Sequence, residues 1–255
     1  MKGAQFSLHA QMEERHWWFL ARRRIVRELV HCVLPPNGER TVLDIGCGTG
    51  GNIAAFAREY RCVGIDPSAD AIRLAQARFP QAQFVQGFPP DGIGPILSSA
   101  HLLLLMDVLE HIPDDSFFFS DLLAQAKPGS YLLITVPADM TLWSPHDVSF
   151  GHHRRYDPDQ LQRLWSRLPV KTLLLSYYNA HLYPLIRMAR NLNQRLGRAS
   201  GQAGTDFKLP IKPVNRLLEN LFASEAWVLA ELLRGRRLEG FRRGVSLIAL
   251  LHKEN

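Results

Sequence analysis

The chain has 255 residues, a hydrophobic fraction of 46%, a charged fraction of 21% and a net charge of +6. This length provides for one large domain with a substantial core, and no apolar run approaches the roughly eighteen residues of a membrane-spanning helix. The first residues lack the apolar core of a signal peptide. Three widely spaced cysteines, Cys32, Cys47 and Cys62, indicate neither a disulfide framework nor a zinc site. We therefore expect a cytoplasmic protein.

The charge is unevenly distributed along the chain. Residues 41–151 contain 5 Lys or Arg against 12 Asp or Glu, whereas residues 187–243 contain 12 against 5. A basic segment of this kind is usually the solvated face of a helix. The alternative is an attractive field for an acidic partner, such as a phosphorylated acceptor or an anionic membrane. No zinc-finger spacing or aromatic-basic RNA-binding motif is present, so we expect no nucleic-acid partner.

Strands and helices alternate through the first half of the chain. An amphipathic helix is predicted over residues 13–34, because apolar side chains recur at three- and four-residue spacing before Pro35 and Pro36. Short apolar strands are predicted at residues 41–45, 61–65, 84–85, 101–106 and 131–136, with helices at 52–60, 68–79 and 114–127. This alternation predicts a Rossmann-like, doubly wound, mostly parallel sheet.

The pattern changes after Pro137. A long polar loop is predicted over residues 137–156, followed by a helix at 158–168, a strand at 170–177 and a last strand at 245–251. We expect one domain in three parts: an N-terminal helical lid (1–40), a Rossmann-like core (41–178 and 242–255) and an Arg-rich helical insertion (179–241).

The strongest motif is the sequence VLDIGCGTGG at residues 42–51. Its glycines allow a sharp turn from strand to helix and a close approach of backbone N–H groups to a ligand. Gly46, Gly48 and Gly51 also satisfy the dinucleotide-binding pattern, so an NAD-dependent oxidoreductase is the alternative. Asp44 favours another ligand, because its carboxylate would repel a pyrophosphate but suits the sulfonium and ammonium groups of S-adenosylmethionine.

Two more acidic residues end predicted strands. Asp66 follows the second strand, where a carboxylate can accept hydrogen bonds from ribose hydroxyls, although capping the next helix is an alternative role. Asp107 ends the fourth strand, at the carboxyl edge where such sheets bind ligands.

With these residues, the chain resembles the class I S-adenosylmethionine-dependent methyltransferase superfamily. The resemblance rests on the successive motifs DIGCGTG, VGIDPS, LLMDVLEHI and KPGSYLLITVP, and it covers about residues 13–178 and the final strand. The bacterial branch that includes the polyprenyl-quinone O-methyltransferases is similar, and the segments ERHWWF and HHRRY resemble a subgroup of it. The resemblance is specific for the cofactor and weak for the acceptor.

The resemblance implies a set of residues that bind S-adenosylmethionine through its methionyl part, ribose and adenine. These are Gly46, Cys47, Gly48, Gly50, Asp66, Pro67, Gly87, Phe88, Asp107 and Val108. Asp44 and Arg22 are further predicted donor-binding residues, for the reasons given for the turn and for the predicted lid. Many relatives have an acidic residue after the third strand to bind the adenine amino group. Here Gly87, Phe88 and Pro89 follow that strand, so adenine recognition must come from backbone or from stacking on Phe88.

Methyl transfer requires in-line positioning, and a general base where the acceptor is deprotonated. The candidate catalytic residues are His111, His146 and His152, with Asp147 as an orienting carboxylate for His146. A structural role for His111 is the alternative. In the quinone-modifying relatives, residues matching Glu110 and His111 resemble metal ligands, but adjacent residues can both ligate only with a bent backbone, and we expect no metal.

The first helix begins with Trp17, Trp18 and Phe19, which are either core residues or a lid whose Arg22 or Arg23 reaches the donor carboxylate. We expect O-methylation of a small or lipid-linked metabolite. A non-catalytic, S-adenosylmethionine-binding accessory protein is a further alternative.

The late basic segment predicts a peripheral contact with an anionic membrane, on the inner face of the membrane. The pattern is an amphipathic helix in which basic and apolar side chains recur within one or two turns. The basic residues are Arg187, Arg190, Arg195 and Arg198, and the apolar residues are Leu185, Ile186, Met188, Leu192 and Leu196.

Overall fold

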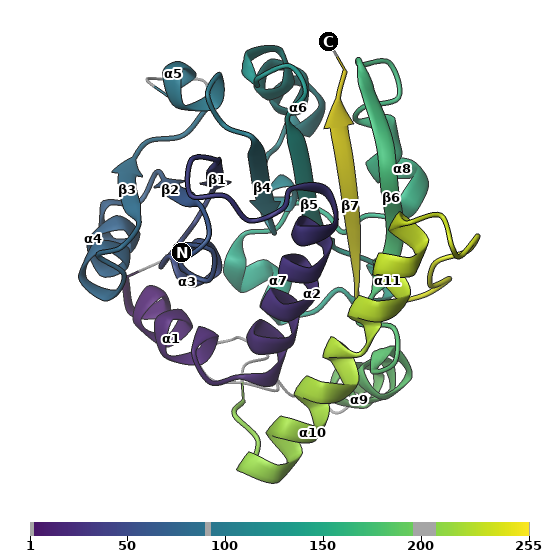
Figure 1. Ribbon diagram of the computed structural model, residues 1–255. Helices are drawn as coiled ribbons and strands as arrows, with labels where there is room; N and C mark the ends of the chain where they lie inside the picture. The colour runs from purple at the N-terminus through teal and green to yellow at the C-terminus, as the bar shows by residue number, and fades with distance from the viewer. Residues whose placement is uncertain (1–2, 90–92, 196–207, 255) are drawn as a thin grey trace.

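The computed structural model describes residues 3–89, 93–195 and 208–254, which form a seven-stranded sheet covered by helices on both faces (Figure 1). The strand order is β3-β2-β1-β4-β5-β7-β6; the first five strands along the chain are parallel, and β7 runs antiparallel to β5 and β6. The strands are β1 Thr41–Ile45, β2 Arg61–Asp66, β3 Gln83–Gln86, β4 Leu102–Met106, β5 Tyr131–Pro137, β6 Val170–Tyr178 and β7 Ser246–Lys253. The predicted Rossmann-like fold is confirmed.

Alternation along the strands divides the core into two layers. In β4, Leu102 and Leu104 join one buried cluster and Leu103 and Leu105 join the other. A parallel strand that is covered on both faces has to be apolar throughout, which explains this run of leucines.

Each face of the sheet has its own set of helices. The first face is covered by α2 (Trp17–Val33), α3 (Gly51–Ala54), α4 (Ala69–Arg78), α10 (Lys212–Ala223) and α11 (Glu225–Leu233). The second is covered by α5 (Gly94–Leu97), α6 (Asp115–Gln125) and α8 (Pro158–Arg163). The segment between β6 and β7 thus extends the core, since Phe222 and Leu229 share a cluster with Ile25 and Leu29 of α2.

The remaining helices precede α2 or follow β4, β5 and β6, and those that Figure 1 labels lie at its middle and in its lower half. They are α1 (Gly3–Glu13), η1 (Leu109–His111), η2 (Met140–Leu142), α7 (Pro145–Phe150) and α9 (Tyr183–Arg195). None of the described helices is both long enough and apolar enough to cross a membrane.

Three boundaries differ from those that the sequence predicts. The predicted helix over 13–34 begins only at Trp17, where the ring of His16 accepts a hydrogen bond from the Trp18 N–H at 3.3 Å, and a separate helix, α1, precedes it. The helix after the glycine-rich turn covers only Gly51–Ala54, and turns follow it. The predicted loop 137–156 contains α7, which begins with a capping box made by Ser144 and Asp147.

Candidate active site

A cavity of about 400 Å³ lies at the carboxyl edge of the sheet. It is enclosed by the two N-terminal helices, the glycine-rich turn, the segment after β4, the loop after β5 and the start of α9. Its lining includes Trp17, Trp18, Phe19, Arg22, Gly46, Cys47, Gly48, Asp107, His111, His146 and His152. The structure therefore brings the predicted lid, one part of the predicted donor site and all three candidate bases to a single cavity, termed the donor cavity below.

The glycine-rich turn is held by β2. The N–H groups of Gly46 and Cys47 donate to the Ile65 carbonyl at 2.8 and 2.9 Å, and the Gly48 N–H donates to Asp66 at 2.9 Å. Gly46 has a φ of +72°, and a Cβ there would lie 2.8 Å from the Val108 side chain. The site requires glycine because the turn and the segment after β4 pack against each other. The Val108 side chain thus packs directly against the glycine-rich turn.

Three carboxyl groups surround this turn. Asp44 is 1% exposed, one of its oxygens has no hydrogen-bond partner among the described residues, and burial raises its pKa to about 8. Asp66 accepts bonds from the Gly48 and Ser68 N–H groups, and burial raises its pKa. Asp107 has a φ of +59°, in the left-handed region that non-glycine residues rarely adopt. Asp44 does not line the donor cavity, so a cationic ligand there, as S-adenosylmethionine is, would act on this carboxyl group through charge and not through contact.

Arg22 points to Asp107. Arg22 is 2% exposed. Its guanidinium forms an ion pair with Asp107, donates to Asn52 at 3.4 Å and lies 4.1 Å from the centroid of the Trp18 ring. Its predicted contact with the donor carboxylate stays a prediction.

The predicted adenine side lies apart from the donor cavity lining. The Gly87 N–H donates to the Asp66 carbonyl at 3.0 Å, and the Gln86 side chain donates to the Pro67 carbonyl at 3.2 Å. Phe88 stacks on Phe118 of α6, with ring centroids 5.3 Å apart. The structure thus leaves four predicted residues outside the lining of the donor cavity: Asp66, Pro67, Gly87 and Phe88. Gly50 does not line the cavity either, and it packs against Phe84.

Hydrogen bonds and an ion pair hold the helix α1 against the glycine-rich turn and α4. Glu13, 2% exposed, accepts a bond from the Thr49 hydroxyl at 3.0 Å and forms an ion pair with Arg78 of α4. Arg78 also donates to the carbonyls of Thr49 and Ala10 at 2.9 and 3.1 Å. These bonds connect α1, the glycine-rich turn and α4. They could not be predicted from the sequence, because nothing local to Arg78 indicates a partner 65 residues away.

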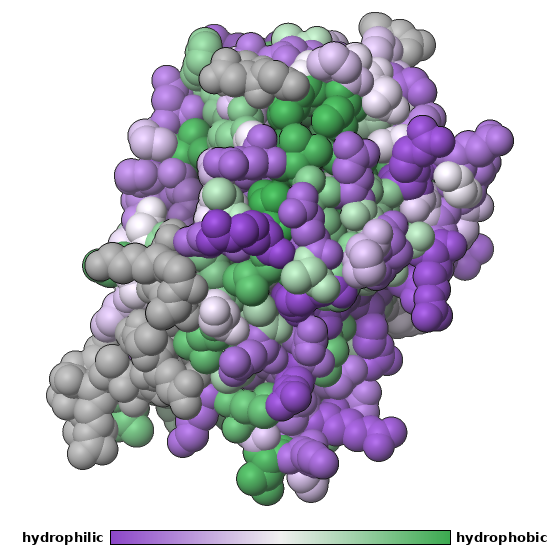
Figure 2. Space-filling view, turned by 90° about the vertical axis from the view of Figure 1, so that its left-hand side faces the viewer, coloured by the Kyte–Doolittle hydropathy of each residue, from purple (hydrophilic) through white to green (hydrophobic). Residues whose placement is uncertain are grey.

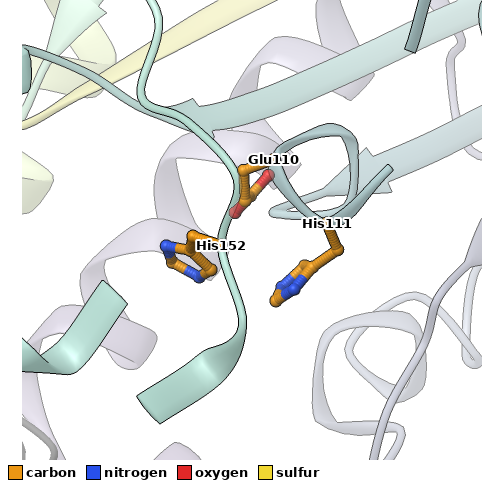
Figure 3. A group of neighbouring side chains, drawn as sticks. All are labelled: Glu110, His111 and His152. Atoms are coloured by element: carbon orange, nitrogen blue, oxygen red, sulfur yellow. The ribbon is translucent and has the colours of Figure 1, made fainter. Parts of the chain in front are cut away.

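Glu110, His111 and His152 point toward one another at the end of the donor cavity (Figure 3). One ligand atom of each lies within 4.8 Å of the others, and the two imidazole rings are 4.7 Å apart at their centroids. Burial lowers the pKa of His111 to about 4, so this ring is neutral at neutral pH. Burial raises the pKa of Glu110 well above its ordinary value, and neither of its carboxyl oxygens has a hydrogen-bond partner among the described residues.

Asp147 orients His152, whereas the sequence suggested that it would orient His146. Its carboxylate lies 3.0 Å from Nδ1 of His152 and accepts two bonds from Arg155, at 2.8 and 3.0 Å. Hydrogen bonds from His152 and Arg155 hold the pKa of Asp147 well below its usual range although it is buried. An ionised Asp147 fixes the proton of His152 on Nδ1 and leaves Nε2 as an acceptor. His146 lies beside Phe150, with ring centroids 4.6 Å apart.

Asn179 is a site residue that sequence reasoning missed. It follows β6, lines the donor cavity, is 1% exposed and has a φ of +53°. Both polar atoms of its amide lack a partner among the described residues. A buried, unpartnered amide costs stability unless a ligand completes its hydrogen bonds. The sequence offers only an asparagine at a strand end as a signal.

Comparisons with known proteins agree with this architecture. A family model described as a methyltransferase domain matches residues 16–192. The trans-aconitate 2-methyltransferase of Azoarcus sp. (strain BH72) is 31% identical over 124 residues, 46% of each chain. The ajmaline N-methyltransferase of Rauvolfia serpentina is 25% identical over 231 residues, 86% of this chain and 72% of the relative.

Solved structures show the same fold. The plantazolicin methyltransferase, determined with a desmethyl-plantazolicin analogue and S-adenosylhomocysteine, superimposes with a TM-score of 0.58 at 14% identity over 99% of this chain and 91% of that one.

The sequence matches to three bacterial trans-aconitate 2-methyltransferases span 46%, 64% and 46% of the relatives' lengths, less than two thirds in each case.

Proposed function

This chain belongs to the class I, S-adenosylmethionine-dependent family of methyltransferase domains, and on that premise we propose that it methylates an oxygen of a small or lipid-linked metabolite. The observation that carries the proposal is that His152, paired with the buried Asp147, lines the same cavity as the glycine-rich turn. The donor supplies a methyl group on a positively charged sulfur.

We assign the donor-binding roles from the motifs that this chain shares with the family. The turn residues Gly46, Cys47 and Gly48 bind the methionyl part, and Gly50 and Val108 keep the turn in shape. Asp66 accepts bonds from the ribose, while Pro67, Gly87 and Phe88 flank the adenine. Asp44 and Asp107 place negative charge near the sulfonium, and the lid helices exclude water.

His152 is the proposed general base. As the acceptor oxygen bonds to the methyl carbon and the carbon–sulfur bond breaks, Nε2 of His152 takes the hydroxyl proton. Asp147 stabilises the imidazolium that forms, and Arg155 fixes Asp147. Asn179, which also lines the donor cavity, offers a donor and an acceptor to the acceptor molecule.

The test measures transfer of labelled methyl groups from the donor to small-molecule and lipid fractions of a cell extract. We expect His152→Gln to lower transfer by about a hundredfold or more, the usual contribution of a general base, with affinity for S-adenosylhomocysteine unchanged. His153→Gln is the matched control, since His153 is the exposed neighbour. Equal transfer by both variants would remove the base assignment. Donor binding by a wild-type protein that transfers nothing would favour the accessory-protein alternative.

A divalent cation is the second candidate for the same group of residues. Two imidazoles and the unpartnered carboxyl group of Glu110 offer three ligand atoms, and the pairing of His152 with Asp147 is typical of metal-binding histidines. Activity lost on chelation and restored by one metal ion, together with that ion in elemental analysis, would favour this alternative. Transfer that resists chelation in a metal-free protein would leave His152 as a base.

A lipid-linked acceptor is supported by the apolar surface of α9 and α10. Leu185, Met188 and Leu192 of α9 are each more than half exposed, at 56%, 65% and 55%. Figure 2 shows hydrophobic side chains at the lower end of the molecule, where α10 lies, and Leu217 there is 66% exposed.

The basic residues of α9 are arranged differently from the sequence expectation. Arg187 contacts Tyr183 and Arg190 donates to the Leu142 carbonyl, so both point toward the loop after β5. The side chain of Arg195, together with Leu196 and Arg198, lies outside the described residues. Lys212 and Arg216 of α10 supply exposed positive charge beside the apolar surface.

A further inference from the structure

A second cavity, of about 390 Å³, lies between the loop after β5, the start of α9 and the segment that leads into β7. Three guanidinium groups, of Arg187, Arg242 and Arg243, line it together with Tyr177 and Tyr183. It is termed the arginine cavity below.

The arginine cavity is separate from the donor cavity. Along the segment into β7, Gly244 lines the arginine cavity, whereas Val245 and Ser246 line the donor cavity. Along α9, Arg187 lines the first and Arg190 the second. Consecutive parts of the same segments thus face opposite ways and form the wall between the two cavities.

The arginines of this cavity have few hydrogen-bond partners, although the charge of Asp139 in the wall attracts Arg187. Arg243 is exposed, and within the part of the chain that the structure describes it has no hydrogen bond or ion pair. The one hydrogen bond that the structure gives for the half-buried Arg187 goes to the neutral hydroxyl of Tyr183, at 3.3 Å. Arg242 pairs with Glu239 at 2.8 Å, but the two side chains are 84% and 68% exposed. Ion pairs that are this exposed contribute little and exchange readily.

The two carboxylates in the wall have other donors. Asp139 accepts bonds from the N–H and hydroxyl of Thr141, at 2.9 and 2.6 Å, and from the Tyr183 hydroxyl at 2.6 Å. Asp157 caps α8 by accepting the Gln160 N–H at 2.7 Å. Arg155, the fourth arginine of the lining, donates hydrogen bonds to Asp147 and to the Ala138 carbonyl. The donors of Arg187 and Arg243 therefore remain for a ligand.

The backbone that carries Arg242 and Arg243 is fixed on both sides. Before them, the Phe241 N–H donates to the Ser176 hydroxyl at 3.0 Å. After them, Gly244 packs so closely on β6 that a Cβ would lie 2.4 Å from the Tyr178 carbonyl oxygen. A fixed backbone lowers the ordering cost of binding.

We propose that the arginine cavity binds a phosphate-type oxyanion, either free phosphate or the phosphate of a monoester. Guanidinium groups offer planar pairs of N–H donors that match phosphate oxygens, and three of them suit a group that carries up to two negative charges. The site is independent of the methyl-transfer proposal, since its lining shares only Arg155 with the donor cavity.

The test uses the whole chain and three probes: inorganic phosphate, glycerol 3-phosphate and acetate. Binding is followed by calorimetry and by amide chemical shifts of Gly244, with Gly46 as the reference position. The Arg187→Gln/Arg243→Gln variant removes two cavity charges. Arg236→Gln/Arg237→Gln removes two exposed charges from the same part of the chain outside the lining, and it keeps the net charge matched.

We expect saturable phosphate binding that shifts Gly244 but not Gly46 in the wild type and the control, weakened about tenfold or more in the cavity variant. Stronger binding of glycerol 3-phosphate would identify a monoester as the ligand, and stronger binding of phosphate would identify the free ion. Acetate binding as strong as both, equal loss in the two variants, or the absence of saturable binding to either phosphate probe would overturn the proposal. Melting temperatures check that both variants are folded.

Discussion

A cationic ligand should change the protonation of the Asp44 carboxyl group. Burial raises its pKa to about 8, against the opposing attraction of Arg22, so the group is protonated at neutral pH in the free protein. A ligand with an ammonium group favours the ionised form. Binding should therefore release a proton, and the affinity for S-adenosylhomocysteine should rise with pH until about pH 8 is reached.

Calorimetry of S-adenosylhomocysteine at pH 7 in phosphate and in Tris measures this release, because the two buffers take up a proton with different heats. Asp44→Asn should abolish the difference between the buffers. Identical heats in both buffers for the wild type would show that Asp44 does not titrate on binding.

The pairing of Asp147 with His152, and not with His146, is a contact that could not be predicted from the sequence. His146 and Asp147 are adjacent on α7, and adjacent side chains on a helix point in different directions, so they do not face each other. Gly151, with a φ of +73°, ends the helix and turns the chain so that His152 meets Asp147. The three residue types were identified from the sequence, but their pairing depended on a turn that no periodic pattern reveals.

At the scale of elements, Arg78 links the predicted lid helix α1 to α4 and to the glycine-rich turn. It bonds to Glu13, to Glu14 and to the carbonyls of Ala10 and Thr49. Arg78→Gln should loosen α1, speed proteolysis near residue 14 and weaken S-adenosylhomocysteine binding several-fold, with little change in melting temperature, since α1 contributes little to the core.

Limited proteolysis and calorimetry check this prediction. Arg73→Gln, on the same helix, is the matched control, because its pair with Asp70 is 74% and 52% exposed. A lid that is cleaved at the same rate in both variants would contradict the role of Arg78.

The strands were predicted to within about two residues, because an apolar run between turn residues is a local signal. The helix α1 was not predicted, because its position depends on Glu13 reaching Thr49 and Arg78, contacts that lie far along the chain. Elements fixed by their own sequence could be predicted, and elements fixed by distant partners could not.

For the molecule as a whole, the apolar surface of α9 and α10 predicts association with vesicles that contain anionic lipid. Exposed apolar side chains beside Lys212 and Arg216 suit the interface of such a membrane. We expect the wild type to sediment with the vesicles at low salt and less at high salt. Leu185→Ser/Met188→Ser should reduce pelleting.

The matched control for the vesicle test is Phe117→Ser/Leu238→Ser, which removes two exposed apolar side chains elsewhere, at 67% and 95% exposure. Pelleting that is absent, or that both variants lower equally, would leave a freely diffusing acceptor as the better assignment.

The most direct test of the whole account is calorimetry of the purified protein with S-adenosylhomocysteine and with NAD. We expect micromolar binding of S-adenosylhomocysteine, no comparable binding of NAD, and a loss of about 1–3 kcal/mol in Asp66→Ala, where hydrogen bonds to an ionised partner disappear. Tighter binding of NAD than of S-adenosylhomocysteine would contradict it.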